Sequence, residues 1–346
     1  MRAVQLITTG RPLEDREIAL PAPGPGEVRV RVAAAGICHS DAHYRRGGPS
    51  LGPLPQTLGH EVAGVVDAVG EGATSLAPGD RVCLHYLVTC GSCSACRRGG
   101  EQFCPQAQMI GKDRDGGFAE HIVVPARNAI PIPEPVSFEH AAVMMCSSAT
   151  AWHALMKSRL RPGESVAVFG VGGLGVSALQ LADVFGAGTV YAVDRVPAKL
   201  ALAERLGAVP VDAGPAHADP VAALMAHTDG RGVDVALDLV GRPETIAAAV
   251  KCLGVQGRAV LVGIGEAPFA VDPYRDILGK EAEIIGCSDH LHGEIGSVLG
   301  LAARGRLDLS AAVTRTVPLE AAAINAALDA LEAGTEGVRT VVTNGG

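Results

Sequence analysis

Aromatic residues, basic charge and long apolar runs are all scarce in this sequence. Only 3% of its 346 residues are aromatic, and 29 Lys and Arg stand against 37 Asp and Glu, a net charge of −8. An acidic chain has no overall positive field to attract phosphate backbones, so we exclude nucleic acid and the membrane surface as principal partners. The longest apolar stretch, residues 166–176, is interrupted by glycine and is much shorter than the roughly 20 residues of a membrane span.

A secretory signal is also missing. The first residues, MRAVQLITTG, contain no apolar signal-peptide core, so we expect a cytoplasmic protein. The nine cysteines are an odd number in a chain without such a signal. This argues against a disulfide framework and favours metal ligands or reactive thiols.

The length and composition favour a two-domain enzyme that acts on a small molecule. A chain of 346 residues is longer than one hydrophobic core usually supports. Hydrophobic residues make up 48% of it, and 44 Gly and 22 Pro indicate many turns in a compact fold rather than disorder.

The hydrophobic pattern in the first third of the chain is that of β-structure. Residues 27–33, EVRVRVA, alternate polar and apolar side chains, and residues 62–70, VAGVVDAVG, are rich in β-branched side chains. After Ser137, a plausible N-cap, a long Ala-rich apolar pattern predicts a helix over residues 138–158. We expect a domain boundary within this helix.

From Glu164 the sequence alternates between strands and helices. Near-continuous apolar strands such as SVAVFGVGG and TVYAVD are separated by helical stretches such as PAKLALAERLG. This alternation predicts a doubly wound α/β domain, with helices covering both faces of a parallel sheet. After about Cys287 only two helices and a terminal strand remain, so we expect this last part to return to the first domain.

A glycine-rich loop follows the first strand of this region. The string GVGGLG places Gly170, Gly172 and Gly175 in a G-x-G-x-x-G pattern, with Gly173 and Leu174 between the last two. The first glycine turns the chain, the second lets backbone N–H groups approach a pyrophosphate, and the third permits close packing of helix and strand. The loop predicts dinucleotide binding; a purely structural glycine turn is the alternative.

An acidic residue bears on the choice of dinucleotide. Asp194 ends the next strand, 24 residues after Gly170, where a carboxylate can hold the adenosine ribose hydroxyls and repel a 2′-phosphate. This favours NAD over NADP. The neighbouring Arg195 could meet such a phosphate, or be a solvated surface charge.

Four cysteines lie close together in a loop rich in Gly, Ser and Arg. Cys90, Cys93, Cys96 and Cys104 form the pattern C-x2-C-x2-C-x7-C. Four thiolates at this spacing can converge on one tetrahedral ion, and a loop without its own hydrophobic core needs such a cross-link. We predict a structural zinc site. The alternatives are free thiols and an iron–sulfur cluster, whose usual spacings differ.

Three more candidate ligands lie far apart in the sequence. They are Cys38 in GICHSDAH, His60 in GHE and Cys146 in MMCSS. No spacing rule links them, and each has an ordinary structural interpretation by itself. Two thiolates and an imidazole would make a zinc site with an open fourth position, which is the arrangement that catalysis requires.

The order of these motifs adds a family resemblance. The segments GICHSDAHYRRG, GHEVAGVV, the four-cysteine loop, DGGFAEH, GVGGLG and GVRTVV follow one another along the whole chain. In this order and at these intervals they resemble the zinc-dependent alcohol dehydrogenases of the medium-chain dehydrogenase/reductase superfamily. The resemblance implies a mostly-β GroES-like catalytic domain over residues 1–147 and a Rossmann NAD-binding domain over residues 148–286. Residues 287–346 would return to the catalytic domain.

The resemblance also implies roles around a catalytic zinc ion. Cys38, His60 and Cys146 would bind the metal, with Glu61 close behind it. Asp41 would orient His60 by accepting a hydrogen bond from its ring.

Further residues match the family's proton relay and phosphate contacts. Ser40 would contact the substrate hydroxyl and begin a relay that runs through the cofactor ribose to His43. His39 and Arg339 match pyrophosphate contacts. Without the resemblance, His39, His43 and Arg339 would be interpreted as ordinary exposed charges.

The remaining matches concern the two ends of the dinucleotide and the substrate pocket. Lys199 would join Asp194 near the adenosine ribose, and the backbone of Val262 and Gly263 would hold the nicotinamide carboxamide. Tyr86 falls where family members line the substrate pocket. Cys83, Cys252 and Cys287 match no family role and are expected in the core. Trp152 is expected in the core or at an interface.

The function implied by the resemblance is the reversible, NAD-dependent oxidation of an alcohol to an aldehyde or ketone by hydride transfer. It includes two zinc ions per chain and a homo-oligomer, with a tetramer favoured over a dimer. One alternative is a polyol dehydrogenase, whose members usually carry a glutamate in place of Cys146. The others are an enoyl or quinone reductase without catalytic zinc, and a non-enzymatic NAD-binding zinc protein that senses redox state.

Overall fold

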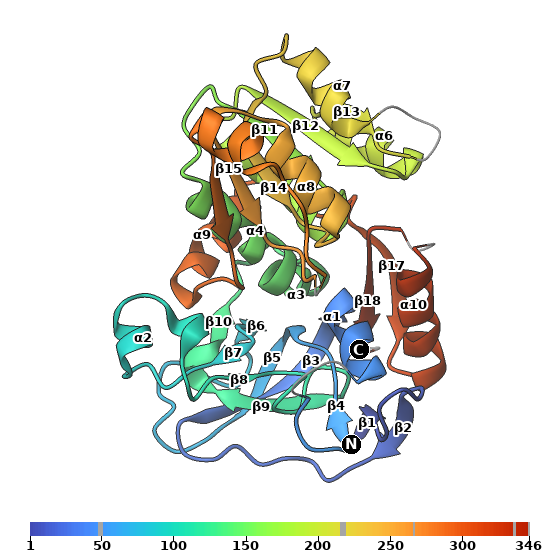
Figure 1. Ribbon diagram of the computed structural model, residues 1–346. Helices are drawn as coiled ribbons and strands as arrows, with labels where there is room; N and C mark the ends of the chain where they lie inside the picture. The colour runs from blue at the N-terminus through green and yellow to red at the C-terminus, as the bar shows by residue number, and fades with distance from the viewer. Residues whose placement is uncertain (48–50, 215–218, 266, 335–336, 345–346) are drawn as a thin grey trace. The chain divides into compact units, whose positions relative to one another are not determined.

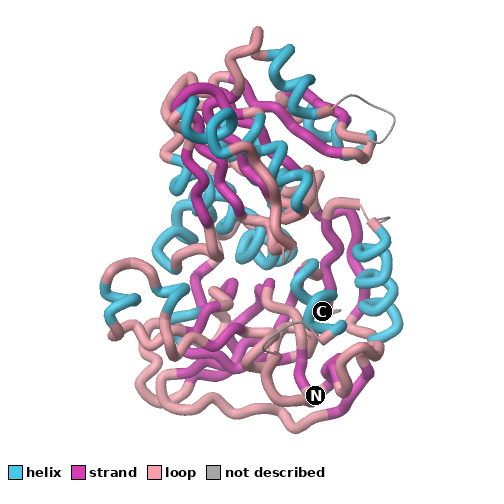
Figure 2. The backbone as a smooth tube through the Cα atoms, viewed as in Figure 1, coloured by secondary structure: helices cyan, strands magenta, loops and turns pink. Residues whose placement is uncertain are grey.

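The computed structural model describes residues 1–47, 51–214, 219–265, 267–334 and 337–344. The chain forms two compact units, one comprising Met1–Cys146 with Leu291–Gly346 and the other Ser147–His290. The boundaries proposed from the sequence, after residues 147 and 286, differ from these by one and four residues. Figure 2 shows the strands and helices of each unit.

The first unit consists mainly of antiparallel β-structure. Its largest sheet has the order β10-β6-β5-β3-β18-β17, and β9 also pairs with β3. The strand β3 buries Val28, Val30 and Val32 and leaves the residues between them more exposed, as the alternation over residues 27–33 predicts. The strands of this unit are β1 Arg2–Leu6, β2 Glu14–Glu17, β3 Glu27–Gly36, β4 Gln56–Thr57, β5 Glu61–Val69, β6 Arg81–Leu84, β7 Leu87–Val88, β8 Gln108–Met109, β9 His121–Pro125, β10 Ala129–Pro131, β17 Val313–Pro318 and β18 Arg339–Thr343.

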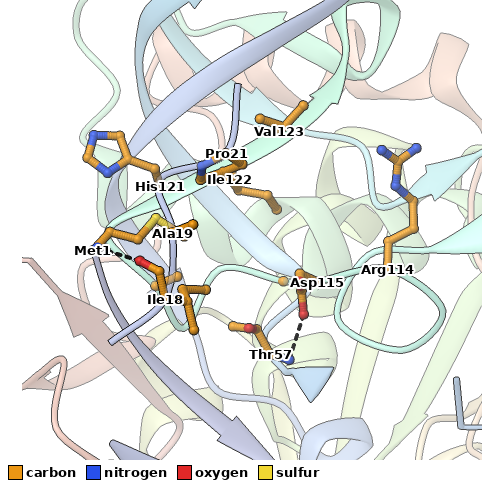
Figure 3. Close-up of a pocket in the computed structure, with 12 residues that line it drawn as sticks. Met1, Ile18, Ala19, Pro21, Thr57, Arg114, Asp115, His121, Ile122 and Val123 are labelled. Carbon is orange, nitrogen blue, oxygen red and sulfur yellow. Dashed lines mark hydrogen bonds between the residues drawn. The ribbon is translucent and has the colours of Figure 1, made fainter. Parts of the chain in front are cut away.

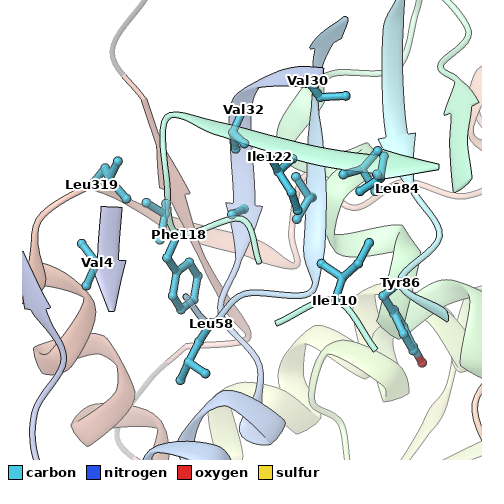
Figure 4. Packing of buried hydrophobic residues seen from close by; sticks show 14 of the residues in the cluster. Val4, Val30, Val32, Leu58, Leu84, Tyr86, Ile110, Phe118, Ile122 and Leu319 are labelled. Atoms are coloured by element: carbon cyan, nitrogen blue, oxygen red, sulfur yellow. The ribbon is translucent and has the colours of Figure 1, made fainter. Parts of the chain in front are cut away.

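A hydrophobic cluster holds this sheet and the segments around it together. Figure 4 shows Val30, Val32, Leu84, Phe118 and Ile122, which all belong to this cluster. The helical segments of the unit are α1 His39–Arg46, α2 Ser94–Arg97, η1 Glu101–Phe103, η2 Ala126–Asn128, α3 Phe138–Val143, α9 His292–Ala303 and α10 Ala321–Ala333. The C-terminal segment adds β17 and β18 to the sheet of the N-terminal part, because β18 pairs with β3.

The second unit is a parallel sheet in the order β13-β12-β11-β14-β15-β16. Each neighbouring pair is parallel, and this order, with the reversal between β11 and β14, is that of a doubly wound dinucleotide-binding fold. The predicted α/β fold class is confirmed. The elements, labelled in Figure 1, are α4 Ala149–Ser158, β11 Ser165–Phe169, α5 Gly173–Val184, β12 Thr189–Asp194, α6 Pro197–Arg205, β13 Val209–Asp212, α7 Pro220–His227, β14 Val233–Asp238, α8 Pro243–Lys251, β15 Leu253–Leu261, η4 Pro273–Ile277, η5 Leu278–Lys280 and β16 Glu283–Gly286.

The helix predicted over residues 138–158 is interrupted. A π-helical segment, η3 Met144–Ser148, lies between α3 and α4 and contains Cys146. A π-helical turn has one more residue than an α-helical turn, so it rotates the side chains that follow it. The apolar pattern of the sequence still looks helical and does not reveal this turn. Turns of this kind are frequent at functional sites.

A search for membrane-crossing helices over the described ranges gives no candidate of sufficient length and apolar character.

Candidate functional site

Four residues from distant parts of the sequence converge within the first unit. The Sγ atoms of Cys38 and Cys146, a ring nitrogen of His60 and a carboxylate oxygen of Glu61 all lie within 4.8 Å of one another. Cys38 is the N-cap of α1, His60 directly precedes β5, Glu61 is the first residue of β5, and Cys146 lies in η3. All but the half-buried Cys146 are buried.

A buried carboxylate ties the segments of this cluster together. Asp41 accepts the backbone N–H of Cys38 (2.9 Å) and that of Gly59 (3.1 Å). Its Oδ1 atom also lies 3.5 Å from Nδ1 of His60. The fully buried Asp41 therefore fixes the backbone on both sides of the cluster and faces the imidazole ring.

The residues present fit a zinc ion. Neither ring nitrogen of His60 has a hydrogen bond among the described residues, although a buried imidazole nitrogen normally has one. The interaction with Cys146 lowers the pKa of Cys38 well below its usual value, which favours the thiolate that metals bind. Two sulfurs and an imidazole nitrogen within 4.8 Å of one another match the donor set of a catalytic zinc site.

Behind this cluster lies a buried ion pair. Glu61 contacts the guanidinium of Arg339, which also donates to the carbonyl of Ile37 at 3.1 Å. Burial tends to raise the pKa of Glu61, and the adjacent guanidinium of Arg339 opposes this rise by stabilising the carboxylate. Arg339 is only 4% exposed, so its interpretation as an ordinary surface charge is wrong. Gly36 is required here, since a Cβ atom at this position would collide with the Glu61 side chain.

The other predicted residues of this region lie on α1. His39 and His43 are exposed and Ser40 is half-buried. The Ser40 hydroxyl is 3.9 Å from the Cys38 sulfur, so it lies beside the ligand cluster. Ser40 and His43 are three residues apart and share one face of the helix.

The four-cysteine loop also converges as the sequence predicts. The sulfurs of Cys90 and Cys96 are 3.9 Å apart, those of Cys93 and Cys96 3.5 Å, and those of Cys104 and Cys90 3.6 Å. A tetrahedral zinc site with Zn–S bonds of about 2.3 Å requires sulfurs about 3.8 Å apart. All nine cysteines of the chain are free thiols.

Hydrogen bonds within the loop stabilise the thiolate form of Cys90. The N–H groups of Ser92 and Cys93 lower the pKa of Cys90 to about 6, whereas burial and neighbouring sulfurs raise the pKa of Cys96 to about 11. Four thiolates so close together repel one another, so a bound cation is needed to ionise them all.

In the second unit the glycine loop has the shape that a pyrophosphate needs. Gly170 has a φ of +95°, and a Cβ atom at Gly175 would collide with the carbonyl oxygen of Gly170. A Cβ atom at Gly172 would meet no atom within 4 Å. The loop is therefore tight at its first and third glycines and open at the second, where the N-terminus of α5 begins.

Asp194 has a further task that the sequence does not reveal. Its carboxylate accepts the N–H of Val171 in the glycine loop (2.8 Å) and those of Arg195 (2.8 Å) and Val196 (2.9 Å). Asp194 thus fastens the glycine loop to the end of β12. Lys199 is half-buried in the first turns of α6, which follows β12.

The predicted carboxamide-binding segment follows β15. The N–H groups of Val262 and Gly263 both donate to the carbonyl of Asp238, at 2.9 and 3.0 Å. Asp238 is a buried carboxyl group that the sequence analysis missed. Its signal was visible, since it is a charged residue at the end of the apolar strand VDVALD.

The residues expected in the core are placed as follows. Burial raises the pKa values of Cys83 and Cys252 to about 12, which makes these thiols unreactive. Cys287 is also buried, and Trp152 is half-buried in edge-to-face contact with Phe185. Tyr86 is buried and lies edge-on to the ring of His60, with 5.3 Å between ring centroids.

A separate pocket of about 280 Å³ lies in the first unit and includes none of the predicted site residues (Figure 3). It is lined by Met1, Ile18, Thr57, Arg114 and His121, among others. The guanidinium of Arg114 already faces a carboxylate at 3.0 Å, and burial lowers the pKa of His121, whose ring lies 3.3 Å from another carboxylate. We assign it no function.

Comparison with known proteins identifies the family. The model of the alcohol dehydrogenase GroES-like domain matches residues 24–134, and that of zinc-binding dehydrogenases matches residues 173–303. An NAD-dependent alcohol dehydrogenase from Sulfurisphaera tokodaii is 33% identical over 341 residues, 96% of each chain.

Solved structures agree with these matches. The crystal structure of an NAD-dependent alcohol dehydrogenase has a TM-score of 0.92 at 34% identity, with both chains fully covered. The alcohol dehydrogenase of Aeropyrum pernix has a TM-score of 0.90 at 37% identity, covering 99% of this chain and all of that one. The chain therefore belongs to the zinc-dependent alcohol dehydrogenase family of the medium-chain dehydrogenase/reductase superfamily.

Proposed function

We propose that this chain is a zinc-dependent, NAD-linked alcohol dehydrogenase that oxidises an alcohol to an aldehyde or ketone. The overall reaction converts the alcohol and NAD⁺ to the carbonyl compound, NADH and one proton. The observation that carries the proposal is the convergence of Cys38, His60 and Cys146 in a three-ligand cluster. Family membership and the glycine loop with Asp194 support the redox partner.

Cys38, His60 and Cys146 would hold the catalytic zinc ion, and Asp41 would orient the imidazole through Nδ1. When bound, zinc supplies a Lewis acid that lowers the pKa of the substrate hydroxyl, and NAD supplies the hydride acceptor. The buried pair of Glu61 and Arg339 balances charge behind the ligands.

Ser40 and His43 would move the proton. Ser40 would accept it from the substrate hydroxyl at Oγ, which its half-buried position beside Cys38 supports. His43 would pass it to solvent, since its ring is exposed one helical turn further along α1. His39 would contact the pyrophosphate from the start of the same helix.

The dinucleotide would bind along the carboxyl edge of the parallel sheet. Gly170, Gly172, Gly173, Leu174 and Gly175 would receive the pyrophosphate on the N-terminus of α5.

The remaining cofactor contacts are proposed from the matched positions. Asp194 and Lys199 would hold the adenosine ribose, Val262 and Gly263 the carboxamide. Arg339, which contacts Glu61, would also approach the pyrophosphate. The carboxylate of Asp194 favours NAD over NADP by repelling a 2′-phosphate.

We propose two zinc ions per chain, one catalytic and one in the four-cysteine loop, which the sulfur distances support. By resemblance to the family we also propose a cytoplasmic homotetramer. Light scattering of the purified protein tests the subunit number directly.

The rival functions differ in what the site requires. An enoyl or quinone reductase of this superfamily would not need the three-ligand cluster. A redox sensor that used Cys83, Cys252 or Cys287 would need reactive thiols. All three are buried, and burial raises the pKa values of Cys83 and Cys252 to about 12.

NADH formation from a panel of primary, secondary and polyhydric alcohols tests the proposal. We expect NADH with at least one alcohol, and its loss on removal of zinc. Reduction of conjugated C=C bonds alone, or NAD binding without turnover, would contradict it.

A further inference from the structure

A buried carboxyl group at the end of β14 has no task in the reaction described above. Asp238 is fully buried, and its Oδ1 atom has no hydrogen-bond partner within the described part of the chain. Burial raises the pKa of Asp238. The Thr245 hydroxyl and the N–H groups of Gly241 and Val240 favour the charged form and oppose this rise. A carboxyl group is costly to bury, and this cost is offset by the hydroxyl and backbone N–H groups that Asp238 binds.

Asp238 lies between the two segments that would bind the dinucleotide. In the sheet it is level with Phe169, the last residue of β11 before the glycine loop, and with Leu261, the last residue of β15. Its backbone carbonyl accepts the N–H groups of Val262 and Gly263. The backbone of Asp238 is thus joined directly to the segment proposed to hold the carboxamide.

The side chain of Asp238 fixes the turn that follows β14. Its Oδ2 atom accepts the N–H of Gly241 at 2.9 Å. Gly241 has a φ of +80°, and a Cβ atom there would lie 2.6 Å from the carbonyl carbon of Gly263. On the other side, a Cβ atom at Gly170 would lie 2.6 Å from the Val240 side chain. The turn is therefore packed tightly against both cofactor segments.

We propose that Asp238 is a positioning residue for the nicotinamide half of NAD, an inference that rests on the proposed function. Its carboxyl group holds Gly241, and Gly241 in turn supports the backbone of Val262 and Gly263. Asp238 itself touches neither cofactor nor substrate. The adenosine half should be affected much less, because Asp194 ends β12, which β11 separates from β14.

The test compares two ligands on the zinc-loaded, full-length protein. NADH affinity is measured by fluorescence titration and ADP-ribose affinity by calorimetry, since ADP-ribose lacks the nicotinamide. We expect Asp238→Ala to raise the Kd for NADH roughly tenfold, as the loss of one buried hydrogen bond would. The Kd for ADP-ribose should rise much less, because the Asp238 carboxylate holds Gly241, which packs on Gly263. The turn meets the glycine loop through Val240 instead. Asp238→Asn, whose side-chain oxygen can still accept the N–H of Gly241, should bind NADH like the wild type.

Asp234 provides the matched control. It lies on the same strand, and its carboxylate accepts the N–H (2.8 Å) and hydroxyl (2.7 Å) of Ser165 at the amino end of β11. Asp234→Ala should change the two affinities equally or not at all.

Several results would overturn the proposal. They are unchanged NADH affinity in Asp238→Ala, an equal loss for both ligands, or a loss in Asp238→Asn as large as that in Asp238→Ala. If neither Asp238→Ala nor Asp238→Val folds, the carboxyl group is structural and the proposal is also wrong. Failure of the wild type to bind NADH would instead contradict the proposed function.

Discussion

Ser40 and His43 share one face of α1, yet they differ in exposure, Ser40 being half-buried and His43 exposed. If they carry the proton, the two residues should respond differently to pH. His43→Gln should lower the rate of alcohol oxidation near neutral pH by about a hundredfold or less. The deficit should shrink as pH rises, because hydroxide can then take the proton from the relay.

Ser40→Ala is the comparison variant. It should cost more than His43→Gln, and high pH should not rescue it, because Ser40 would contact the substrate oxygen itself. Steady-state rates from about pH 6 to about pH 10 separate the two cases. A His43→Gln profile parallel to that of the wild type would make the histidine an ordinary surface residue.

Asp194 has two roles: its negative charge would repel a 2′-phosphate, and its carboxylate accepts a hydrogen bond from the glycine loop. Two substitutions separate these roles. Asp194→Asn removes the charge but keeps an acceptor for the N–H of Val171, so it should lower the preference for NAD over NADP about tenfold or more. Asp194→Gly, with Arg195 retained, should also relax the preference but weaken NAD binding further, because the glycine loop loses its tie.

Equilibrium binding of both dinucleotides to the two variants checks this prediction. A wild-type protein that binds NADP more tightly than NAD would show that our interpretation of Asp194 is wrong.

His85 is a buried histidine held in its neutral form. Burial lowers its pKa to about 3, with smaller contributions from His292 and Arg127. Glu101 lies 3.8 Å away, but it is already engaged by Arg127 and by the backbone N–H of His292. In the unfolded chain a histidine binds a proton below about pH 6.5.

Between about pH 6.5 and about pH 3 the unfolded state therefore binds one more proton at His85 than the folded state, so acid destabilises the fold. In His85→Phe this contribution disappears. The free energy of unfolding should then fall less steeply as the pH is lowered. Its slope should be smaller than that of the wild type by up to about 1.4 kcal/mol per pH unit. Chemical denaturation at several pH values measures the slope; equal slopes would refute this role.

At the scale of elements, the zinc ion proposed for the four-cysteine loop should be what orders that loop. The short helices α2 and η1 bury only Ala95 between them, too little apolar surface to order the loop. Removal of zinc by a chelator should therefore release the loop while the two larger cores stay folded. Trypsin should then cut after the exposed Arg97 or Arg98.

The control is Cys93→Ser without chelator, which should show the same cleavage. Peptide mapping after limited digestion identifies the cut. Cleavage spread over the whole chain, or none at the loop, would show that the metal does not hold this element.

The sequence predicts these elements unequally, for a physical reason. The four cysteines and the glycine loop are local, so spacing alone indicates their chemistry. Cys38, His60 and Cys146 meet only through the pairing of β3 with β5 and through the π-helical turn around Cys146. No local pattern encodes that meeting, so only the family resemblance predicted it. The hydrogen bond from Gly59 to Asp41 joins residues far apart in the sequence, so no local pattern predicts it. The bonds of Asp41 to Cys38 and of Asp238 to Gly241 each span three residues, but what these two turns pack against depends on tertiary contacts.

At the scale of the whole molecule, the two chemistries reside in different units. The metal-ligand clusters belong to the unit of Met1–Cys146 and Leu291–Gly346, and the glycine loop with Asp194 belongs to Ser147–His290. Each unit has its own hydrophobic core. A substitution in either metal-ligand cluster should therefore leave the fold of the unit Ser147–His290 intact.

The most direct test of the account is the zinc content per chain, determined on the same samples as the rate of NADH formation. The two ligand clusters predict about two zinc ions in the wild type. Cys146→Ser should retain about one zinc ion and a folded chain but lose nearly all turnover, whereas Cys93→Ser should mainly lose stability. Iron in place of zinc, a single zinc ion in the active wild type, or full turnover in Cys146→Ser would contradict the account.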